Sequence, residues 1–263
     1  MLNLSHIDHG NSFDWGLVSK DYAKYRDIYP EEFYRRITDL GLCVQGQSAL
    51  DLGTGTGVLP RNMYKYGAEW TGTDISENQI AEAVRLAADG GMNIRFFTAP
   101  AENTQLPDNC FDVVTALQCF VYFDKAKVLP EIVRLLKPDG RFLILFMAWL
   151  PGESEIAAKS EELVLQYNPA WTGGGMGRDV PTMPEGSEEY FDCLNVITYE
   201  TSVTFTPESW HGRMTACRGI GASSLPKEKL SEWSREHTEY VNTLPDSFDV
   251  PHWVSMMDFK VKT

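Results

Sequence analysis

The residues best placed to do chemistry lie in a glycine-rich segment, Ala-Leu-Asp-Leu-Gly-Thr-Gly-Thr-Gly, over residues 49–57. Glycines at this spacing let a backbone turn sharply and approach a bound ligand closely. Two details argue against the pyrophosphate of NAD as that ligand. Val58 stands where the dinucleotide motif has Gly or Ala, and the carboxylate of Asp51 would repel phosphate. The same carboxylate suits a ligand that carries an ammonium group.

A second acidic residue, Asp74, follows in the segment Thr-Gly-Thr-Asp-Ile. We expect it at the end of the next strand, where a carboxylate accepts hydrogen bonds from both ribose hydroxyls of a nucleoside. An alternative role, capping the helix that follows, is better filled by Ser76. The two segments together predict a nucleoside-binding site.

Alternating apolar runs and amphipathic stretches would position these residues. The pattern predicts strands over residues 48–52, 69–74, 93–98, 113–116 and 141–146. It predicts helices over residues 58–66, 77–88 and 125–136. Strands that alternate with helices indicate a parallel sheet. Later strands over 195–205 and 253–261, with a helix over 207–219, are expected to close that sheet with an antiparallel edge.

Several short motifs occur in a characteristic order, over residues 50–57, 72–76, 101–102, 106–107, 111–114 and 136–140. In order and spacing they resemble the class I S-adenosylmethionine-dependent methyltransferases, in the branch called the type 11 methyltransferase domain. The resemblance implies an α/β fold: a Rossmann-like three-layer sandwich around a mostly parallel seven-stranded sheet with an antiparallel C-terminal edge strand. It also implies a single domain over residues 1–263, divided into an N-terminal lid (1–40), a cofactor-binding core (48–147) and substrate-side helices and closing strands (148–263).

The resemblance further implies a site for S-adenosyl-L-methionine at the glycine loop. The loop backbone would pass under the methionine part of the cofactor, and its residues are Gly53, Thr54, Gly55 and Gly57. Asp51, two residues earlier, would help to hold the ammonium group of the cofactor.

Other cofactor contacts are implied beyond the loop. Asp74 would bind the ribose, and Ile75 would pack on the adenine, whose edge would meet Ala101 and Glu102. Gln118 would lie beside the methionine amino group, just past the fourth strand.

The segment Tyr-Ala-Lys-Tyr-Arg over residues 22–26 resembles the N-terminal lid of the family. Arg26 would pair with the cofactor carboxylate, and Tyr22 would help to cover the site. We expect this segment to be mobile without ligand and ordered with it. The alternative is a permanently docked helix.

The chain departs from its family at two places. Pro100 replaces an Asp that often precedes the Ala-Glu pair, and Val121-Tyr122 stands where close relatives often carry His-Trp. Methyl transfer from a sulfonium mainly requires alignment of the nucleophile and exclusion of water, so the sequence assigns no catalytic residue.

Some side chains in the chain could act chemically, but simpler roles are favoured. His211 and His237 are expected to be surface or packing histidines rather than bases. Cys119 is expected to be a buried thiol rather than a covalent catalyst. Arg213 and Arg218 could bind an anionic substrate, although solvated surface charge is the default expectation.

Composition excludes several classes of partner. The formal net charge is −14 and no Lys/Arg cluster occurs, which disfavours nucleic acids and acidic membranes. The polar N-terminus lacks a secretory signal, which indicates a cytoplasmic protein. The five cysteines show no Cys-x-x-Cys pair, and His6 and His9 lie in a segment without a helical pattern to hold them, so no metal site is expected.

The favoured function is therefore methyl transfer to a small-molecule acceptor. Three alternatives remain: a non-catalytic S-adenosylmethionine-binding or interaction protein, a nicotinamide-dependent oxidoreductase, and a methyltransferase that acts on RNA or protein. Val58 and Asp51 argue against the oxidoreductase, and the net charge argues against RNA. The acceptor and the oligomeric state stay open at this point.

Overall fold

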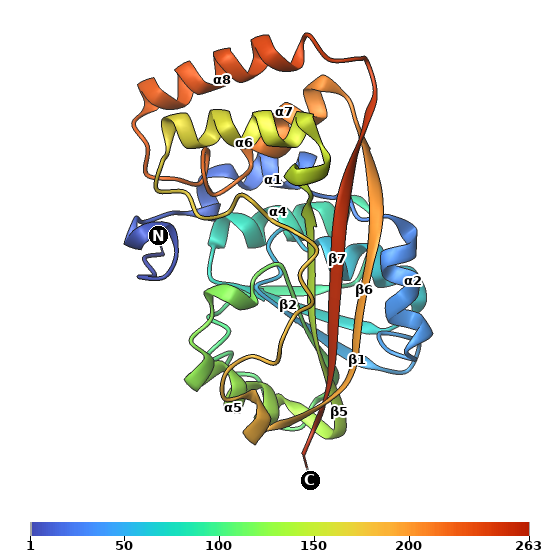
Figure 1. The fold of residues 1–263 in the computed structure, drawn as a ribbon. Coiled ribbons are helices and arrows are strands. Elements are labelled where there is room, and N and C mark those ends of the chain that lie inside the picture. Colours follow the sequence, from blue (N-terminus) through green and yellow to red (C-terminus); the bar gives the residue numbers. More distant parts are fainter. Residues whose placement is uncertain (1, 263) are drawn as a thin grey trace. The chain divides into compact units, whose positions relative to one another are not determined.

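The computed structural model describes residues 2–262, which form a seven-stranded sheet with the order β3-β2-β1-β4-β5-β7-β6 (Figure 1). The strands are β1 (Ser48–Leu52), β2 (Glu69–Asp74), β3 (Arg95–Thr98), β4 (Phe111–Leu117), β5 (Leu136–Trp149), β6 (Phe191–Phe205) and β7 (Phe248–Val261). The sheet is mostly parallel, with antiparallel strands at its C-terminal edge. The fold class predicted from the sequence is confirmed.

The α-helices of the described residues are α1 (Ser19–Tyr25), α2 (Glu31–Asp39), α3 (Val58–Met63), α4 (Glu77–Asp89), α5 (Lys125–Leu135), α6 (Glu155–Tyr167), α7 (Pro207–Thr215) and α8 (Lys227–Val241). The sequence patterns predicted α3, α4, α5 and α7. They did not predict α8, whose buried residues Trp233, His237 and Val241 form a narrow stripe on an otherwise polar helix. No helix within residues 2–262 is both long enough and apolar enough to cross a membrane.

Two compact units divide the chain. The helical unit comprises Met1–Ile28, Ala148–Asp179 and Glu200–Trp253, and it contains α1, α6, α7 and α8. The sheet unit comprises Tyr29–Met147, Val180–Tyr199 and Val254–Thr263, and it contains β1 to β4 and α2 to α5. The single-domain organisation inferred from the sequence stays a prediction.

In the sheet unit, parallel pairing brings the carboxyl ends of three strands together. β1 pairs with β2 on one side and with β4 on the other, so that Asp51 lies opposite both Gly72 and Thr115. Because the chain winds outward in both directions from β1 and β4, right-handed crossovers place α4 and α5 on opposite faces of the sheet (Figure 1). In open α/β sheets, ligands bind outside the carboxyl ends of the strands at such a switch in winding direction.

In the helical unit, α7 packs against α1 and α8, and α6 packs against α8. Its core is rich in tryptophan: Trp210 and Trp233 are fully buried, and the Trp149 ring meets the Trp210 ring edge-on. The chain's first residues are part of this packing, because Phe13 forms bridges with both Leu2 and Ser223. The N-terminal segment is therefore structured, although its sequence shows no regular pattern.

Candidate functional site

The glycine loop, residues 53–57, leaves β1 and turns into α3. Gly53, Gly55 and Gly57 have φ values of +62°, +56° and +73°, all in the left-handed region that favours glycine. Space is restricted as well, because a Cβ on Gly53 would lie 2.8 Å from Sγ and 2.9 Å from Cβ of Cys119. Conformation and packing therefore both require glycine at position 53.

Asp74 connects the end of β2 to this loop. Its Oδ2 accepts a hydrogen bond from the Gly55 backbone N–H at 2.9 Å, and its Oδ1 accepts one from the Ser76 N–H at 2.8 Å. Burial raises the pKa of the Asp74 carboxyl group, and these two backbone hydrogen bonds oppose that shift. Ser76 is the N-cap of α4, as expected. Each carboxylate oxygen has a second lone pair, which leaves capacity for a ribose hydroxyl.

Asp51 is buried on β1, two residues before the glycine loop. Asp51 is only 2% exposed, and its Oδ1 accepts a hydrogen bond from the Thr115 hydroxyl at 2.6 Å. Burial raises the pKa of Asp51 to about 7; the hydroxyls of Thr115 and, to a smaller degree, Thr54 oppose this, and the nearby charge of Asp74 adds to it. Thr115 is not predicted from the sequence, because its one signal is a hydroxyl within the apolar run of β4.

The residues expected at the adenine differ in exposure. Ile75 is 58% exposed and offers apolar surface directly after Asp74, whereas Ala101 is buried. Glu102 accepts a hydrogen bond at Oε1 from the Asp124 backbone N–H at 2.9 Å, which ties the segment after β3 to the start of α5. Ile75 thus presents exposed apolar surface and the Glu102 carboxylate is fixed, and the roles of both at an adenine stay predictions.

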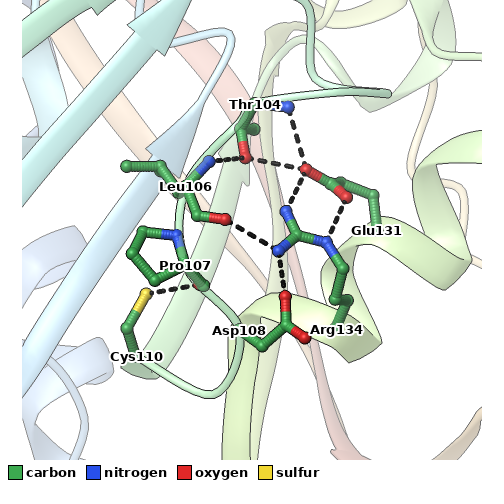
Figure 2. Close-up of polar contacts among 7 residues, drawn as sticks. All are labelled: Thr104, Leu106, Pro107, Asp108, Cys110, Glu131 and Arg134. Carbon is green, nitrogen blue, oxygen red and sulfur yellow. Dashed lines mark hydrogen bonds and ion pairs between the residues drawn. The ribbon is translucent and has the colours of Figure 1, made fainter.

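A polar network holds the segment that follows Glu102 (Figure 2). Glu131 accepts hydrogen bonds from the backbone N–H and hydroxyl of Thr104 at 2.8 and 2.7 Å, and it pairs with Arg134. Arg134 also donates to the Leu106 carbonyl at 2.7 Å and contacts Asp108. Burial raises the pKa of Glu131, but the hydrogen bonds from Arg134 and Thr104 outweigh burial and lower it overall. The network fixes residues 104–108, which include the Leu-Pro motif, on α5.

Gln118 follows β4 in an uncommon backbone conformation. Its φ of +66° costs a residue with a side chain about 1–2 kcal/mol. Its backbone N–H donates to the Leu145 carbonyl at 2.9 Å, and its side-chain amide donates to the Met147 carbonyl. These two contacts hold the strained conformation in place. The role of Gln118 beside a methionine amino group stays a prediction.

Tyr22 and Arg26 belong to the helical unit. The Arg26 guanidinium lies over the Tyr22 ring at 4.5 Å and over the Trp15 ring at 5.4 Å, and its Nη1 donates to the Ala216 carbonyl at 3.1 Å. The Tyr25 ring packs on Gly212, where a Cβ would lie 2.3 Å from the ring. These contacts dock α1 on α7 within the helical unit, and the roles of Tyr22 and Arg26 toward a cofactor stay predictions.

The side chains weighed as bases or nucleophiles are packed. Nδ1 of His211 lies 2.8 Å from Nδ1 of His237, and the Trp233 ring stacks on both imidazoles. Burial lowers the pKa of His237 to about 3. Burial also raises the pKa of Cys119 well above its usual value, which keeps the thiol protonated. The packing role expected for the two histidines agrees with the structure, whereas Cys119, expected to be buried, is only half-buried.

The two arginines expected at the surface are buried instead. Arg213 is 5% exposed and lies over the Trp149 ring at 4.7 Å, and Arg218 is 8% exposed and pairs with Asp8. The expectation of solvated charge is wrong because aromatic packing and an ion pair compensate for lost hydration. Within residues 2–262 no group of His, Cys, Asp or Glu side chains is arranged to hold a metal ion.

The groups around the loop fit the ligand predicted from the sequence. The loop itself, residues 53–57, contains no Lys or Arg, and the carboxylates of Asp51 and Asp74 lie at its start and against its Gly55 N–H. Arg61 is a cation at the loop, and its Nε donates to the Thr56 carbonyl at 3.1 Å. Two carboxylates at the loop oppose a pyrophosphate as the ligand. Ribose hydroxyls and an ammonium group donate hydrogen bonds, and carboxylates accept them. Ile75 adds exposed apolar surface for a base.

Comparison with known proteins identifies relatives of the chain. Residues 50–144 match the family described as a methyltransferase domain. The chain is 31% identical over 179 residues to a ubiquinone biosynthesis O-methyltransferase of Stutzerimonas stutzeri, a match that covers 64% of this chain and 76% of that protein. It is 40% identical over 114 residues to the demethylmenaquinone methyltransferase of Thermus thermophilus, a match that covers 42% of this chain and about half, 52%, of that relative.

A crystal structure of the YcgJ protein of Bacillus subtilis has the same fold. It aligns over 89% of this chain and 100% of that chain, with a TM-score of 0.51 and 19% sequence identity. The ordered motifs, the strand order and the sequence relatives lead to the same assignment. The chain belongs to the class I S-adenosylmethionine-dependent methyltransferases, and residues 50–144 carry its match to the methyltransferase domain.

Proposed function

We propose that this protein transfers the methyl group of S-adenosyl-L-methionine to a small-molecule acceptor. The observation that carries the proposal is the hydrogen bond between Asp74 and the Gly55 N–H, which joins the candidate ribose ligand to the glycine loop. Two relatives are named for demethylmenaquinone and for ubiquinone biosynthesis, which supports an acceptor of small-molecule size. The net charge of −14 opposes a nucleic acid as the acceptor.

In this proposal the chain acts by binding and orienting. The bound cofactor supplies a sulfonium methyl group that needs no activation by the protein. Asp74 holds the ribose, Ile75 covers the base, and Gln118 lies near the amino group. We assign no catalytic base, because His211 and His237 are engaged with each other and the Cys119 thiol is protonated.

Calorimetric titration with S-adenosylhomocysteine and with NAD tests the proposal. We expect binding of S-adenosylhomocysteine and no comparable affinity for NAD. Replacing Asp74 with Ala should weaken the S-adenosylhomocysteine affinity by about 1.5–3 kcal/mol, the usual loss for charge-assisted hydrogen bonds. Asp89→Ala is the matched control, because that carboxylate pairs with Arg85 on the surface of α4.

Asp74 also accepts two backbone hydrogen bonds, so the Ala variant loses stability and its binding must be measured well below its melting temperature. Tight NAD binding without S-adenosylhomocysteine binding would overturn the proposed function. Equal cofactor affinity of Asp74→Ala and the parent protein would remove Asp74 from the site.

The contacts of α1 bear on the proposed lid. Because Tyr25 packs on Gly212 and Arg26 donates to Ala216, the structure favours the docked helix over a segment that orders on binding. We expect amide hydrogen exchange in residues 19–26 to be equally slow with and without S-adenosylhomocysteine. A clear gain of protection on binding would restore the lid, and a loss of affinity in Arg26→Ala at unchanged protection would assign Arg26 to the cofactor.

A further inference from the structure

The buried contact between Asp51 and Thr115 has a geometry that points to a role in addition to cofactor binding. Thr115 lies in the middle of β4, is fully buried, and stands opposite Asp51 in the parallel register. Its hydroxyl oxygen lies 2.6 Å from Oδ1 of Asp51 and 3.3 Å from the Leu50 carbonyl oxygen. One hydroxyl thus faces two acceptors on the neighbouring strand, although it carries a single proton.

This geometry accommodates both protonation states of the carboxyl group. With Asp51 ionised, the Thr115 hydroxyl donates to Oδ1. With Asp51 protonated, the carboxyl O–H donates to the Thr115 oxygen, and the Thr115 hydroxyl turns to donate to Leu50. Neither state leaves the hydroxyl without a partner, so the proton can be gained or lost without moving heavy atoms.

The groups around Asp51 make its protonation state sensitive to a nearby positive charge. Asp74, at the end of β2, adds like charge. The thiols of Cys43, before β1, and Cys119, after β4, also lie within its field, and burial raises the pKa of both so that they stay neutral. With burial and Asp74 acting together, the Asp51 pKa of about 7 falls in the physiological range. A positive charge bound at the glycine loop would favour the ionised form.

We propose that Thr115 is a positioning residue that, with Asp51, forms a buried proton switch next to the glycine loop. When bound, the cofactor would supply an ammonium group that favours the ionised form of Asp51. Asp51 would then give up its proton to solvent, and the Thr115 hydroxyl would donate to the resulting carboxylate. This inference rests on the proposed function, because it concerns the same cofactor. Its consequence is that cofactor binding releases a proton and weakens as the pH falls below 7.

The test is calorimetric titration of the full chain with S-adenosylhomocysteine at pH 6, 7 and 8, in two buffers with different ionisation enthalpies. We expect binding about tenfold weaker at pH 6 than at pH 8, because one proton must leave a group that titrates near pH 7. The buffer dependence of the binding heat should show proton release near pH 6.5. Methylthioadenosine shares the adenosine part but has no ammonium group, so its binding should show neither effect. This ligand therefore distinguishes titration of Asp51 from titration of Asp74.

Matched variants assign the switch to Thr115. Thr115→Val removes the hydroxyl that stabilises the carboxylate, so the pH at which affinity is half lost should rise by about one unit. Thr115→Ser should restore the parent profile, and Asp51→Asn should abolish the pH dependence. Thr73→Val is the control, because Thr73 is equally buried on β2 and its hydroxyl contacts no hydrogen-bond partner among the described residues.

Two outcomes overturn the switch while leaving the proposed function intact. One is S-adenosylhomocysteine binding with the same affinity at pH 6 and pH 8 and no proton release. The other is an identical shift in Thr115→Val and Thr73→Val. Absence of S-adenosylhomocysteine binding at every pH would instead reject the proposed function. If Thr115→Val does not fold, the parent protein, Thr115→Ser and Asp51→Asn still decide the matter.

Discussion

Replacing Asp8 with Ala is expected to lower the free energy of unfolding by about 3–5 kcal/mol, the cost of leaving a buried charge without its partner. Oδ2 of Asp8 accepts from Nε of Arg218 at 2.7 Å, and Oδ1 accepts from Nη2 at 3.1 Å. The Thr172 backbone N–H and hydroxyl add hydrogen bonds to Oδ1 at 2.7 and 3.0 Å. The two charged side chains are only 5% and 9% exposed, so water cannot replace the lost carboxylate.

Denaturant unfolding followed by circular dichroism measures this loss. The control is Asp39→Ala, which breaks the pair with Arg35, whose two side chains are both 57% exposed. That variant should lose about 0–1 kcal/mol, as expected for a surface pair. Adding Arg218→Met to Asp8→Ala should recover much of the loss, because the unpaired charge is then removed. Equal stability of Asp8→Ala and Asp39→Ala would contradict a structural role for the buried pair.

Replacing Gly53 with Ala is expected to destabilise the protein by about 2–5 kcal/mol, from roughly 1–2 kcal/mol of backbone strain and roughly 1–3 kcal/mol of overpacking. The strain follows from the φ of +62°. The overpacking follows from Cys119, whose Cβ would lie 2.9 Å from the new methyl group and is too close to its own backbone to move away. The same change displaces the loop backbone, so S-adenosylhomocysteine affinity should fall with stability.

Gly91 provides a control with nearly the same backbone conformation. Its φ is +63°, and a Cβ there would meet nothing within 4 Å. Gly91→Ala should therefore show the strain alone, about 1–2 kcal/mol, and unchanged S-adenosylhomocysteine affinity. The difference between the two variants, measured by thermal unfolding and by calorimetry, isolates the packing at Cys119. Identical losses in both variants would show that the loop has room for a side chain.

The local chemistry of the sequence determined the glycine loop and the strand ends beside it. The glycines of residues 53–57 form the sharp turn expected of them, with positive φ values, and Asp74 ends β2 with Ser76 as the helix cap. Strands β1 and β2 begin and end at the predicted residues. These features depend on neighbours within a few positions, where the preferences of single residues decide the conformation.

Only the tertiary structure decided which side chains meet across long separations. Asp8 and Arg218 are 210 residues apart in the sequence, and Thr115 and Asp51 are 64 apart. A pattern of residue types shows neither pairing, because each depends on strand order and helix packing to bring its partners together. For that reason the sequence placed Arg218 in solvent and overlooked Thr115. A buried polar group needs a hydrogen-bond or ion-pair partner, and the fold determines which distant residue supplies it. The local sequence pattern contains no information about that partner.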